Sequence, residues 1–343
     1  MFVLPSTGLE ARLARKPSGL PTADVIAIVE TPLPRPAANE VLVRNIAFRL
    51  SPTIRMMISE GAENVEGVPF PALRVGEVLR EEALGEVIAA PDGHALGRGD
   101  LVLHHYGWRD YAAVPVANCL KVSRDVTDIN LHLSHGWTAY AALTRGLNIS
   151  HGDTVFISSA AGAIGSMAGQ IARLLGADKV IGSTSTRAKA DRLIRELGYD
   201  AAVIRGAGAM AGQLAKAAPQ GIDAVLDSAG GEALQAAVEV ARERARILVI
   251  GALSGQLDAK GTGRRAPVEL DSFKLLLKKL TIRGYSADDD PDARREWDSH
   301  LGRCSAAGQI RFPHEIVRGL RHAPEALAKA SRGEFFGAVL VVP

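Results

Sequence analysis

The chain of 343 residues has little cysteine: only Cys119 and Cys304 occur. Two cysteines cannot build a framework of several disulfides, and such scarcity fits the reducing cytoplasm. The opening residues, MFVLPSTGLEAR, lack a basic segment followed by an apolar core, so they do not resemble a secretory signal. No apolar run is long enough to span a bilayer. We therefore expect a cytoplasmic protein with no membrane partner.

The chain also has no large excess of charge of either sign. Lys and Arg number 40 and Asp and Glu number 38, a formal net charge of +2. Without a strong basic field, a nucleic-acid partner is not expected. Neither a G-x-S-x-G elbow nor a Cys/His arrangement typical of a catalytic nucleophile occurs. These absences leave a small molecule as the expected partner.

One stretch, Thr154 to Leu175, stands out as TVFISSAAGAIGSMAGQIARLL. Its apolar, β-branched start predicts a buried strand, and its later apolar residues repeat at the spacing of one helix face. Between them, Ala160, Gly162 and Gly165 fall on the G-x-G-x-x-G frame, with alanine at the first position. The strand before and the helix after are the context that this motif requires for dinucleotide binding.

Each position of this turn has a predicted task. Gly162, which carries no side chain, lets backbone N–H groups of Ala163 and Ile164 approach a pyrophosphate, and Gly165 lets the helix pack on the strand. The helix N-terminus supplies unpaired donors and partial positive charge. The alternative is a tight strand-to-helix turn that binds nothing.

The two halves of the chain have different patterns of predicted secondary structure. Up to about residue 120, strand-like runs are separated by Pro- and Gly-rich turns, which predicts a β-rich, barrel-like domain; the runs are Asp24–Glu30, Glu40–Asn45, Gly85–Ala89 and Asp100–His104. After a helix expected at Asn130–Leu143, strands and helices alternate, which predicts a doubly wound parallel sheet. The expected strands are Thr154–Ser158, Lys179–Gly182, Ala201–Ile204, Ala224–Asp227, Arg246–Gly251 and Leu280–Gly284, and the expected helices Arg187–Leu197, Ala209–Ala217, Gly231–Arg242 and Val268–Lys279. The end of the chain, Gly333–Pro343, is predicted to form a strand that could return to the first domain.

The end of the second parallel strand predicts which dinucleotide binds. An acidic residue there would favour NAD, but the segment reads GSTSTRAK and contains none. Hydroxyls at Ser183 and Thr186 followed by the cations Arg187 and Lys189 suit a ribose 2′-phosphate, so NADP is the predicted cofactor. The alternative for the two cations is that they are ordinary solvated helix residues.

A zinc site is not expected. Two cysteines cannot supply a four-cysteine lobe, and the histidines show no recognisable ligand spacing with Cys119. Without a metal to polarise an alcohol, hydride addition to a conjugated double bond is the more feasible chemistry, because its enolate oxygen needs only hydrogen-bond donors.

Several ordered segments resemble the zinc-independent medium-chain dehydrogenase/reductase superfamily, most of all its leukotriene B4 dehydrogenase, prostaglandin reductase, double-bond reductase and curcumin reductase group. The segments are RNIAFRLSPTIRMM (Arg44–Met57), GWRDY (Gly107–Tyr111), HGWTAYAAL (His135–Leu143), the glycine turn, LGYDAAV (Leu197–Val203), DSAGGEAL (Asp227–Leu234), GALSG (Gly251–Gly255), APEAL (Ala323–Leu327) and FFGAVLVV. Their order and spacing cover nearly the whole chain.

The resemblance implies a GroES-like β-barrel domain of residues 1–125 and 305–343, and a Rossmann NADP-binding domain of residues 126–304 that pairs as a homodimer. It implies reduction of α,β-unsaturated aldehydes or ketones with NADPH. Carried over by position, the cofactor would be lined by Thr138, Lys189, Ser228, the loop of Gly251, Ala252, Leu253, Ser254 and Gln256, and by Tyr285 near the carboxamide. The substrate pocket would lie around residues 51–55, 106–108 and 264–271.

The chain also departs from the family pattern. Gln256 replaces a tyrosine credited with supporting the ribose or the enolate, and Arg205 replaces the tyrosine after LGFD, where it could still hold a 2′-phosphate. Phe335 replaces the asparagine of the C-terminal motif. The cofactor side is thus retained while the substrate side is changed.

The sequence and the resemblance together are compatible with three functions. The first is an NADPH-dependent ene-reductase with Tyr285 or Tyr106 as proton donor, although either tyrosine could equally be a packing aromatic. The second is a quinone reductase or a biosynthetic reductase of a polyketide or alkaloid. The third is a module that binds NADPH without turnover.

Overall fold

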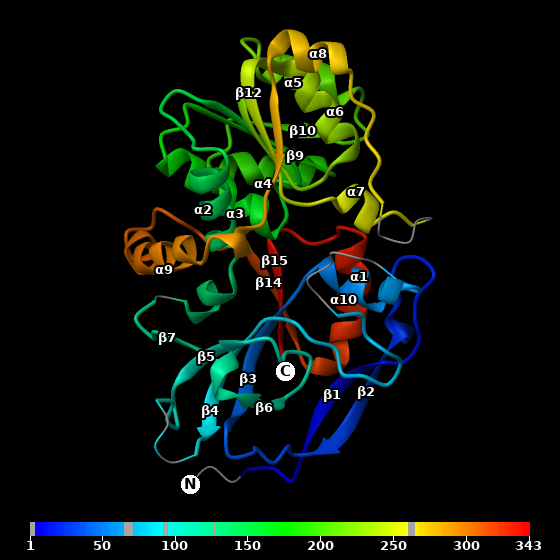
Figure 1. Cartoon of the computed structure of the whole chain (residues 1–343), viewed down its shortest axis with the longest axis vertical. Coiled ribbons are helices and arrows are strands. Elements are labelled where there is room, and N and C mark those ends of the chain that lie inside the picture. The colour runs from blue at the N-terminus through cyan, green and yellow to red at the C-terminus, as the bar shows by residue number, and fades with distance from the viewer. Residues whose placement is uncertain (1–3, 65–70, 92, 94, 127, 260–264) are drawn as a thin grey trace.

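The computed structural model describes residues 4–64, 71–91, 93, 95–126, 128–259 and 265–343. Figure 1 shows a parallel sheet with its helices above a second, mainly antiparallel sheet. The last strand of the chain runs into the second sheet, so the first and last parts of the sequence fold together.

The upper sheet has the strand order β10-β9-β8-β11-β12-β13, and all its pairs are parallel. The strands are β8 (Thr154–Ile157), β9 (Lys179–Thr184), β10 (Ala201–Ile204), β11 (Ile222–Asp227), β12 (Ala241–Val249) and β13 (Thr281–Gly284). The order reverses between β8 and β11, which is where such sheets bind dinucleotides. The predicted doubly wound Rossmann sheet is confirmed.

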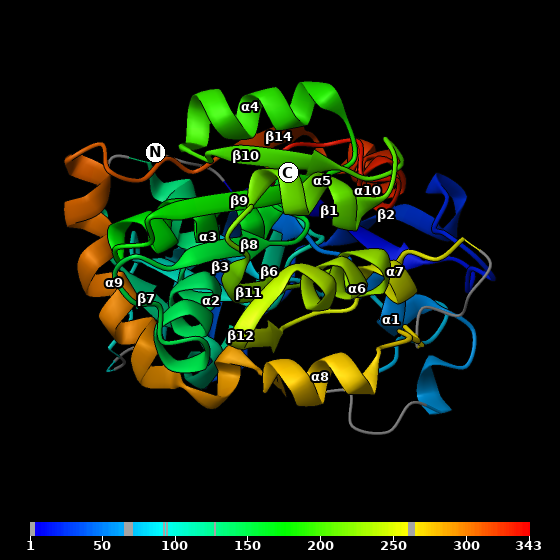
Figure 2. The same ribbon diagram turned by 90° about the horizontal axis from the view of Figure 1, so that it is seen from above.

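Both faces of this sheet are buried, and successive strand residues serve opposite faces. In β8, Val155 and Ile157 pack in one apolar cluster and Phe156 in another. The first cluster contains α2 (Gly136–Ala141), α3 (Ala163–Leu174), α4 (Arg187–Leu197) and α9 (Pro291–Ala306). The second contains α5 (Met210–Ala217), α6 (Gly231–Val240) and residues beside α8 (Ser272–Lys278). Figure 2 shows α4 and α8 on opposite sides of the strands.

The lower sheet has the order β14-β15-β3-β4-β5-β7, with β6 also paired to β3. Its strands are β3 (Glu40–Leu50), β4 (Ala83–Ala89), β5 (Leu101–His104), β6 (Tyr111–Pro115), β7 (Leu120–Val122), β14 (His314–Arg318) and β15 (Ala338–Val342). A separate hairpin is formed by β1 (Thr7–Leu13) and β2 (Ile26–Pro32). Because β15 pairs antiparallel with β3, the predicted return of the C-terminal strand is confirmed.

The single helix predicted at Asn130–Leu143 is wrong. A 3-10 turn at Ile129–Leu133 ends at Ser134, whose backbone is extended, and α2 begins at Gly136. A π-helical turn, Ala142–Gly146, follows. The break allows Gly136 to lie under Trp297 of α9: a Cβ on Gly136 would be 2.3 Å from the indole. Tertiary packing has overridden the local helical pattern here.

Two predicted helix ends were also too long. The helix predicted to reach Arg242 ends at Val240, because Ala241 already begins β12. The helix predicted from Val268 begins at Ser272, where the Asp271 carboxylate caps it by accepting from the Phe273 N–H at 2.9 Å.

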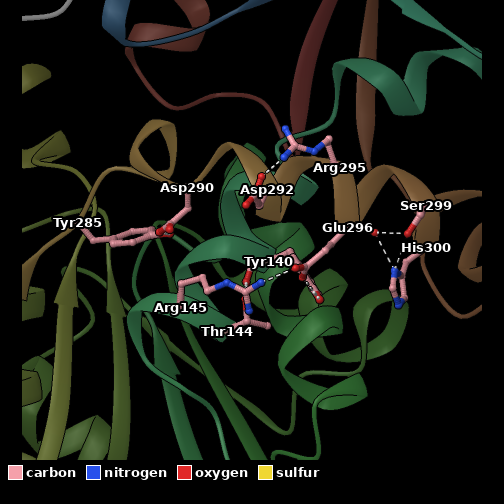
Figure 3. Close-up of polar contacts among 10 residues, drawn as sticks. All are labelled: Tyr140, Thr144, Arg145, Tyr285, Asp290, Asp292, Arg295, Glu296, Ser299 and His300. Carbon is pink, nitrogen blue, oxygen red and sulfur yellow. Dashed lines mark hydrogen bonds and ion pairs between the residues drawn. The ribbon is translucent and has the colours of Figure 1, made fainter.

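Several elements had no expectation from the sequence: β1, β6, β7, α1 (Thr53–Ile58), α9, β14 and α10 (Ala323–Ser331). Of these, α9 packs against α2, where Glu296 accepts a hydrogen bond from the Tyr140 hydroxyl at 3.2 Å and pairs with Arg145 (Figure 3). Across the described parts of the chain, no helix is both long and apolar enough to serve as a membrane span.

Candidate active site

The glycine turn joins β8 to α3 by a very close backbone contact. A Cβ on Gly165 would lie 2.5 Å from the Ala160 Cα and 2.6 Å from the Ser159 carbonyl oxygen. Real Cβ atoms do not approach backbone so closely, so only glycine fits. At Gly162, a Cβ would lie 3.2 Å from the Ser159 carbonyl, which is tight but less severe. The packing task predicted for Gly165 thus has a direct structural basis.

Neighbouring strands hold this turn in place. The Ser159 N–H donates to the Ser183 hydroxyl at 3.1 Å, and the Ala160 N–H donates to the Ser183 carbonyl at 2.8 Å. The Tyr199 hydroxyl donates to the Gly165 carbonyl at 2.6 Å. Ser183, near the carboxyl end of β9, therefore fixes the turn through both its hydroxyl and its carbonyl oxygen.

The C-terminal segment passes beside the same turn. The Gly337 N–H donates to the Ala161 carbonyl at 2.8 Å, and Gly162 and Gly337 form a parallel bridge. The Lys189 ammonium donates to the Gly333 carbonyl at 2.5 Å. Phe335 lies within this segment and packs against the apolar cluster of the lower half. Residues distant in sequence thus meet where a pyrophosphate and ribose would lie.

Three cations gather beyond the end of β9. Burial lowers the pKa of Lys189, with the nearby charges of Arg192 and Arg205 acting in the same direction against Glu315 and Glu334. Arg205 follows β10, and its N–H donates to the Thr184 carbonyl at 2.9 Å. Carboxylates balance part of this charge, because Glu315 and Glu334 act on Lys189 and Arg192 pairs with Glu196 at 2.9 Å. Arg192 has no counterpart in the predicted set, and its guanidinium lies 3.9 Å from the centre of the Phe336 ring.

The two other residues predicted for the phosphate differ in placement. Thr186 is the N-cap of α4, and its hydroxyl accepts from the Lys189 N–H at 3.3 Å. The Arg187 side chain is 82% exposed and pairs with Asp191 at 3.2 Å, one turn along the helix. Arg187 therefore has the environment of a solvated helix residue.

Buried polar groups connect the carboxyl ends of β8 and β11. The Ser158 hydroxyl donates to the Asp227 carboxylate at 2.6 Å and accepts from the Ser228 N–H at 2.9 Å. Burial raises the pKa of Asp227, and the hydrogen bonds oppose this. The Leu253 N–H donates to the Ser228 carbonyl at 3.0 Å, so the loop from Gly251 through Ala252 to Ser254 lies against Ser228. The structure brings these predicted residues together.

The loop continues into α7 (Leu253–Gln256), which meets α1 of the lower half. The Gln256 carbonyl accepts a hydrogen bond from the Arg55 guanidinium, and the Gln256 amide lies 3.3 Å from the Met56 sulfur. Arg55 is 1% exposed, and burial lowers its pKa. Gln256 thus joins the two halves of the molecule beside the predicted cofactor loop.

The two predicted proton donors lie in different places. The Tyr285 hydroxyl donates to Asp290 at 2.6 Å (Figure 3), and burial together with Asp290 raises the pKa of this tyrosine. The guanidinium groups of Arg80 and Arg109 lie 5.3 and 5.8 Å from the centre of the Tyr106 ring. It borders a cavity of 220 Å³ between the β1–β2 hairpin and β6. The structure does not bring the two tyrosines into one cluster.

Thr138 lies in α2, one residue beyond Trp137. The guanidinium of Arg294 lies over the indole of Trp137, 5.1 Å from its ring centre.

The sequence analysis did not identify Ser158, Asp227 and Arg192 as site residues. Asp227 and Ser158 could have been found as polar residues ending two adjacent apolar strands, whereas nothing local marks Arg192.

Comparison with known proteins agrees with this geometry. Family models described as "Zinc-binding dehydrogenase" and "N-terminal domain of oxidoreductase" match residues 163–301 and 10–122. A Bacillus subtilis protein named as an NADP-dependent oxidoreductase, YfmJ, is 30% identical over 340 residues, 97% of this chain and 96% of its own. The NADPH-dependent curcumin reductase of Escherichia coli is 27% identical over 341 residues, covering 96% and 95%. The crystal structure of CurA in complex with NADPH from Vibrio vulnificus superposes with a TM-score of 0.86 at 28% identity, covering 97% and 98%.

The chain is therefore a two-part oxidoreductase with a Rossmann sheet. It belongs to the medium-chain dehydrogenase/reductase superfamily, in the zinc-independent group of curcumin and double-bond reductases. At the level of this family, the predictions of an enzyme and of NADP as cofactor are confirmed.

The name of one family model mentions zinc. Among the residues that the structure describes, no group of three or more His, Cys, Asp or Glu side chains is placed to hold a metal ion. The residues in the described ranges therefore do not fit a zinc site.

Proposed function

We propose that this protein is an NADPH-dependent reductase of an activated C=C bond in an α,β-unsaturated carbonyl compound. The observation that carries the cofactor side is that Lys189 donates to the Gly333 carbonyl while Gly337 of the same segment donates to the Ala161 carbonyl, so this cation lies near the glycine turn. The substrate class is supported by the relative named as a curcumin reductase and by the family resemblance of the whole chain.

We propose that the glycine turn binds the pyrophosphate through the backbone of Gly162 to Gly165. Lys189 and Arg205 hold the 2′-phosphate, while Ser228 and the loop of Gly251 to Gln256 border the nicotinamide ribose. NADPH supplies, when bound, a hydride for the β-carbon of the substrate. The enolate that results needs a hydrogen-bond donor at its oxygen and a proton at its α-carbon.

Activity is predicted with conjugated acceptors only. NADPH oxidation, followed by the loss of its absorbance, is expected with a panel of enals and enones but not with simple alcohols plus NADP⁺. Quinones in the same panel test the neighbouring reductase class. No oxidation of NADPH by any acceptor, despite binding of NADPH, would instead support a binding module without turnover.

We also propose that the chain forms a homodimer through the free edge of the parallel sheet. β13 ends the strand order, and α8 beside it exposes Phe273, Leu276 and Leu277 by 67%, 69% and 64%. Contiguous exposed apolar side chains of this size mark interaction surfaces. A second copy would cover them and extend the sheet.

Light scattering of the purified protein is expected to give twice the chain mass. The double variant Leu276→Asp/Leu277→Asp should give the mass of one chain, while Leu174→Asp, at an exposed leucine on α3, should leave the dimer intact. A monomeric wild-type protein at micromolar concentration would contradict this proposal.

We propose the domain limits that the sequence predicts, which are residues 1–125 with 305–343, and residues 126–304. In support, α9 ends at Ala306 and the next strand, β14, belongs to the lower sheet. The crossing between the halves thus falls within a few residues of the proposed limit.

A further inference from the structure

A group of charged side chains lies buried between the two halves of the molecule. Arg49 of β3 pairs with Glu82 at 2.7 Å, and Arg294 of α9 approaches the same carboxylate at 3.3 Å. Glu81, the preceding residue, lies 4.0 Å from Arg49, and its two carboxylate oxygens accept from the Ser51 hydroxyl at 3.2 and 3.1 Å. The side chains of Glu81 and Glu82 are 11% and 4% exposed.

The two adjacent glutamates have opposite protonation behaviour. Burial raises the pKa of both, but for Glu82 the charges of Arg49 and Arg294 outweigh burial, so its pKa is lowered. Arg49 at a longer distance and the hydrogen bonds of Ser51 lower the pKa of Glu81 less than burial raises it, so this pKa rises to about 7. Two carboxyl groups whose environments separate their pKa values are a common arrangement of acid and base in active sites.

The position of Glu81 connects it to the predicted substrate pocket from two sides. Ser51 directly precedes the first turn of α1, whose Arg55 binds the carbonyl of Gln256 in the cofactor loop. The Gly107 N–H donates to the Glu81 carbonyl at 3.0 Å. Glu81 therefore joins the segments 51–55 and 106–108, two of the three parts of the expected pocket. Of its third part, residues 264–271, Arg264 lies outside the described residues.

The opposite side of the cluster reaches α2, the helix that carries Thr138 of the predicted cofactor site. Arg294, which holds Glu82, lies over Trp137, the residue before Thr138. Charged groups are costly to bury and are retained where they serve a reaction or a specific pairing. Glu82 is neutralised by its two arginines, which leaves Glu81 as the member of the pair able to exchange a proton near neutral pH.

We propose that Glu81, acting through the hydroxyl of Ser51, supplies the proton that completes reduction of the double bond. This inference rests on the proposed function. As the hydride forms the new C–H bond at the β-carbon, the π electrons of the C=C bond move toward the carbonyl to give the enolate. When Glu81 is protonated, its carboxyl O–H donates to the Ser51 oxygen, the reverse of the bond that the ionised carboxylate accepts from Ser51. The Ser51 O–H then gives its proton to the α-carbon, and the Ser51 oxygen takes one from the Glu81 carboxyl. Glu81 is reprotonated from solvent, so the sum is enone, NADPH and H⁺ giving the saturated carbonyl compound and NADP⁺.

Activity should therefore fall as pH rises through about 7, because only protonated Glu81 can donate. The groups that face Glu81 are Ser51 and Arg49 from β3 and its extension and Glu82 from its own segment. Behind them lie Arg294 of α9, His105, and His135 at the start of α2; burial together with both arginines lowers the pKa of His135, which remains neutral in this range.

The test compares Glu81→Gln with wild type on an enone that the wild type reduces. We expect kcat to fall at least ~100-fold, with NADPH affinity unchanged and the alkaline loss of activity abolished. Ser51→Ala should give a similar loss of kcat. Glu86→Gln makes the same chemical change on β4, where the side chain pairs with Arg44, and should keep both kcat and the pH profile.

An independent readout is the infrared band of a protonated carboxyl group. Part of its intensity should be lost in the wild type as pH is raised through about 7, and this loss should be missing from Glu81→Gln. Unchanged kcat and pH profile in a folded Glu81→Gln, or their loss in Tyr285→Phe instead, would overturn this inference while leaving the proposed function standing. A wild type inactive on every enone would refute the proposed function, and the proton path with it.

Discussion

Replacing Gly165 by alanine is expected to lower the free energy of unfolding by about 3 kcal/mol and to weaken NADPH binding more than ~10-fold. The added Cβ would lie 2.5 Å from the Ala160 Cα, 2.6 Å from the Ser159 carbonyl oxygen and 2.9 Å from the Ala160 carbonyl carbon. All three atoms are backbone, so no side-chain rotation can relieve the overlap. The helix must move away from β8, and its N-terminal N–H groups move with it.

Urea unfolding and a fluorescence titration with NADPH measure the two effects. The matched control is Gly212→Ala in α5, where a Cβ meets nothing within 4 Å. That variant should be unchanged or more stable by up to ~1 kcal/mol, because alanine favours helix over glycine. Equal stability of the Gly165 and Gly212 variants would show that the turn can open without cost.

Lys189→Ala is expected to weaken NADPH binding by ~10- to 100-fold while leaving NADH binding nearly unchanged. A hydrogen bond to a charged group contributes roughly 1.5–3 kcal/mol, which sets this range. Lys189 is anchored near the Gly333 carbonyl and faces the same region as Arg192 and Arg205. NADH lacks the phosphate, so it has no comparable interaction to lose.

Arg187→Ala provides the comparison, because Arg187 is 82% exposed and paired with Asp191. We expect it to change NADPH affinity less than ~3-fold, as is typical of an exposed ion pair. Dissociation constants for both nucleotides, measured at one salt concentration, distinguish the two residues. Equal losses for NADPH and NADH in Lys189→Ala would contradict the assignment of Lys189 to the phosphate.

The parallel sheet could be predicted because its signals are local. The apolar run of β8, the glycines at positions 162 and 165 and the helical spacing of α3 lie within one short stretch of sequence. Where tertiary contacts competed with such signals, prediction failed. The helix expected over residues 130–143 was broken because Gly136 had to accept Trp297 of α9, more than 150 positions away.

The sequence by itself thus determined the parallel sheet, the glycine turn and the preference for NADP over NAD, since each depends on residues that are neighbours along the chain. Only the tertiary structure decided that residues 333–337 lie beside that turn and that Arg49, Glu81, Glu82 and Arg294 share one buried site. Their pairing depends on β3, the segment before β4 and α9 meeting between the two halves. Local sequence patterns do not encode this contact, because it depends on how the elements of the complete fold pack together.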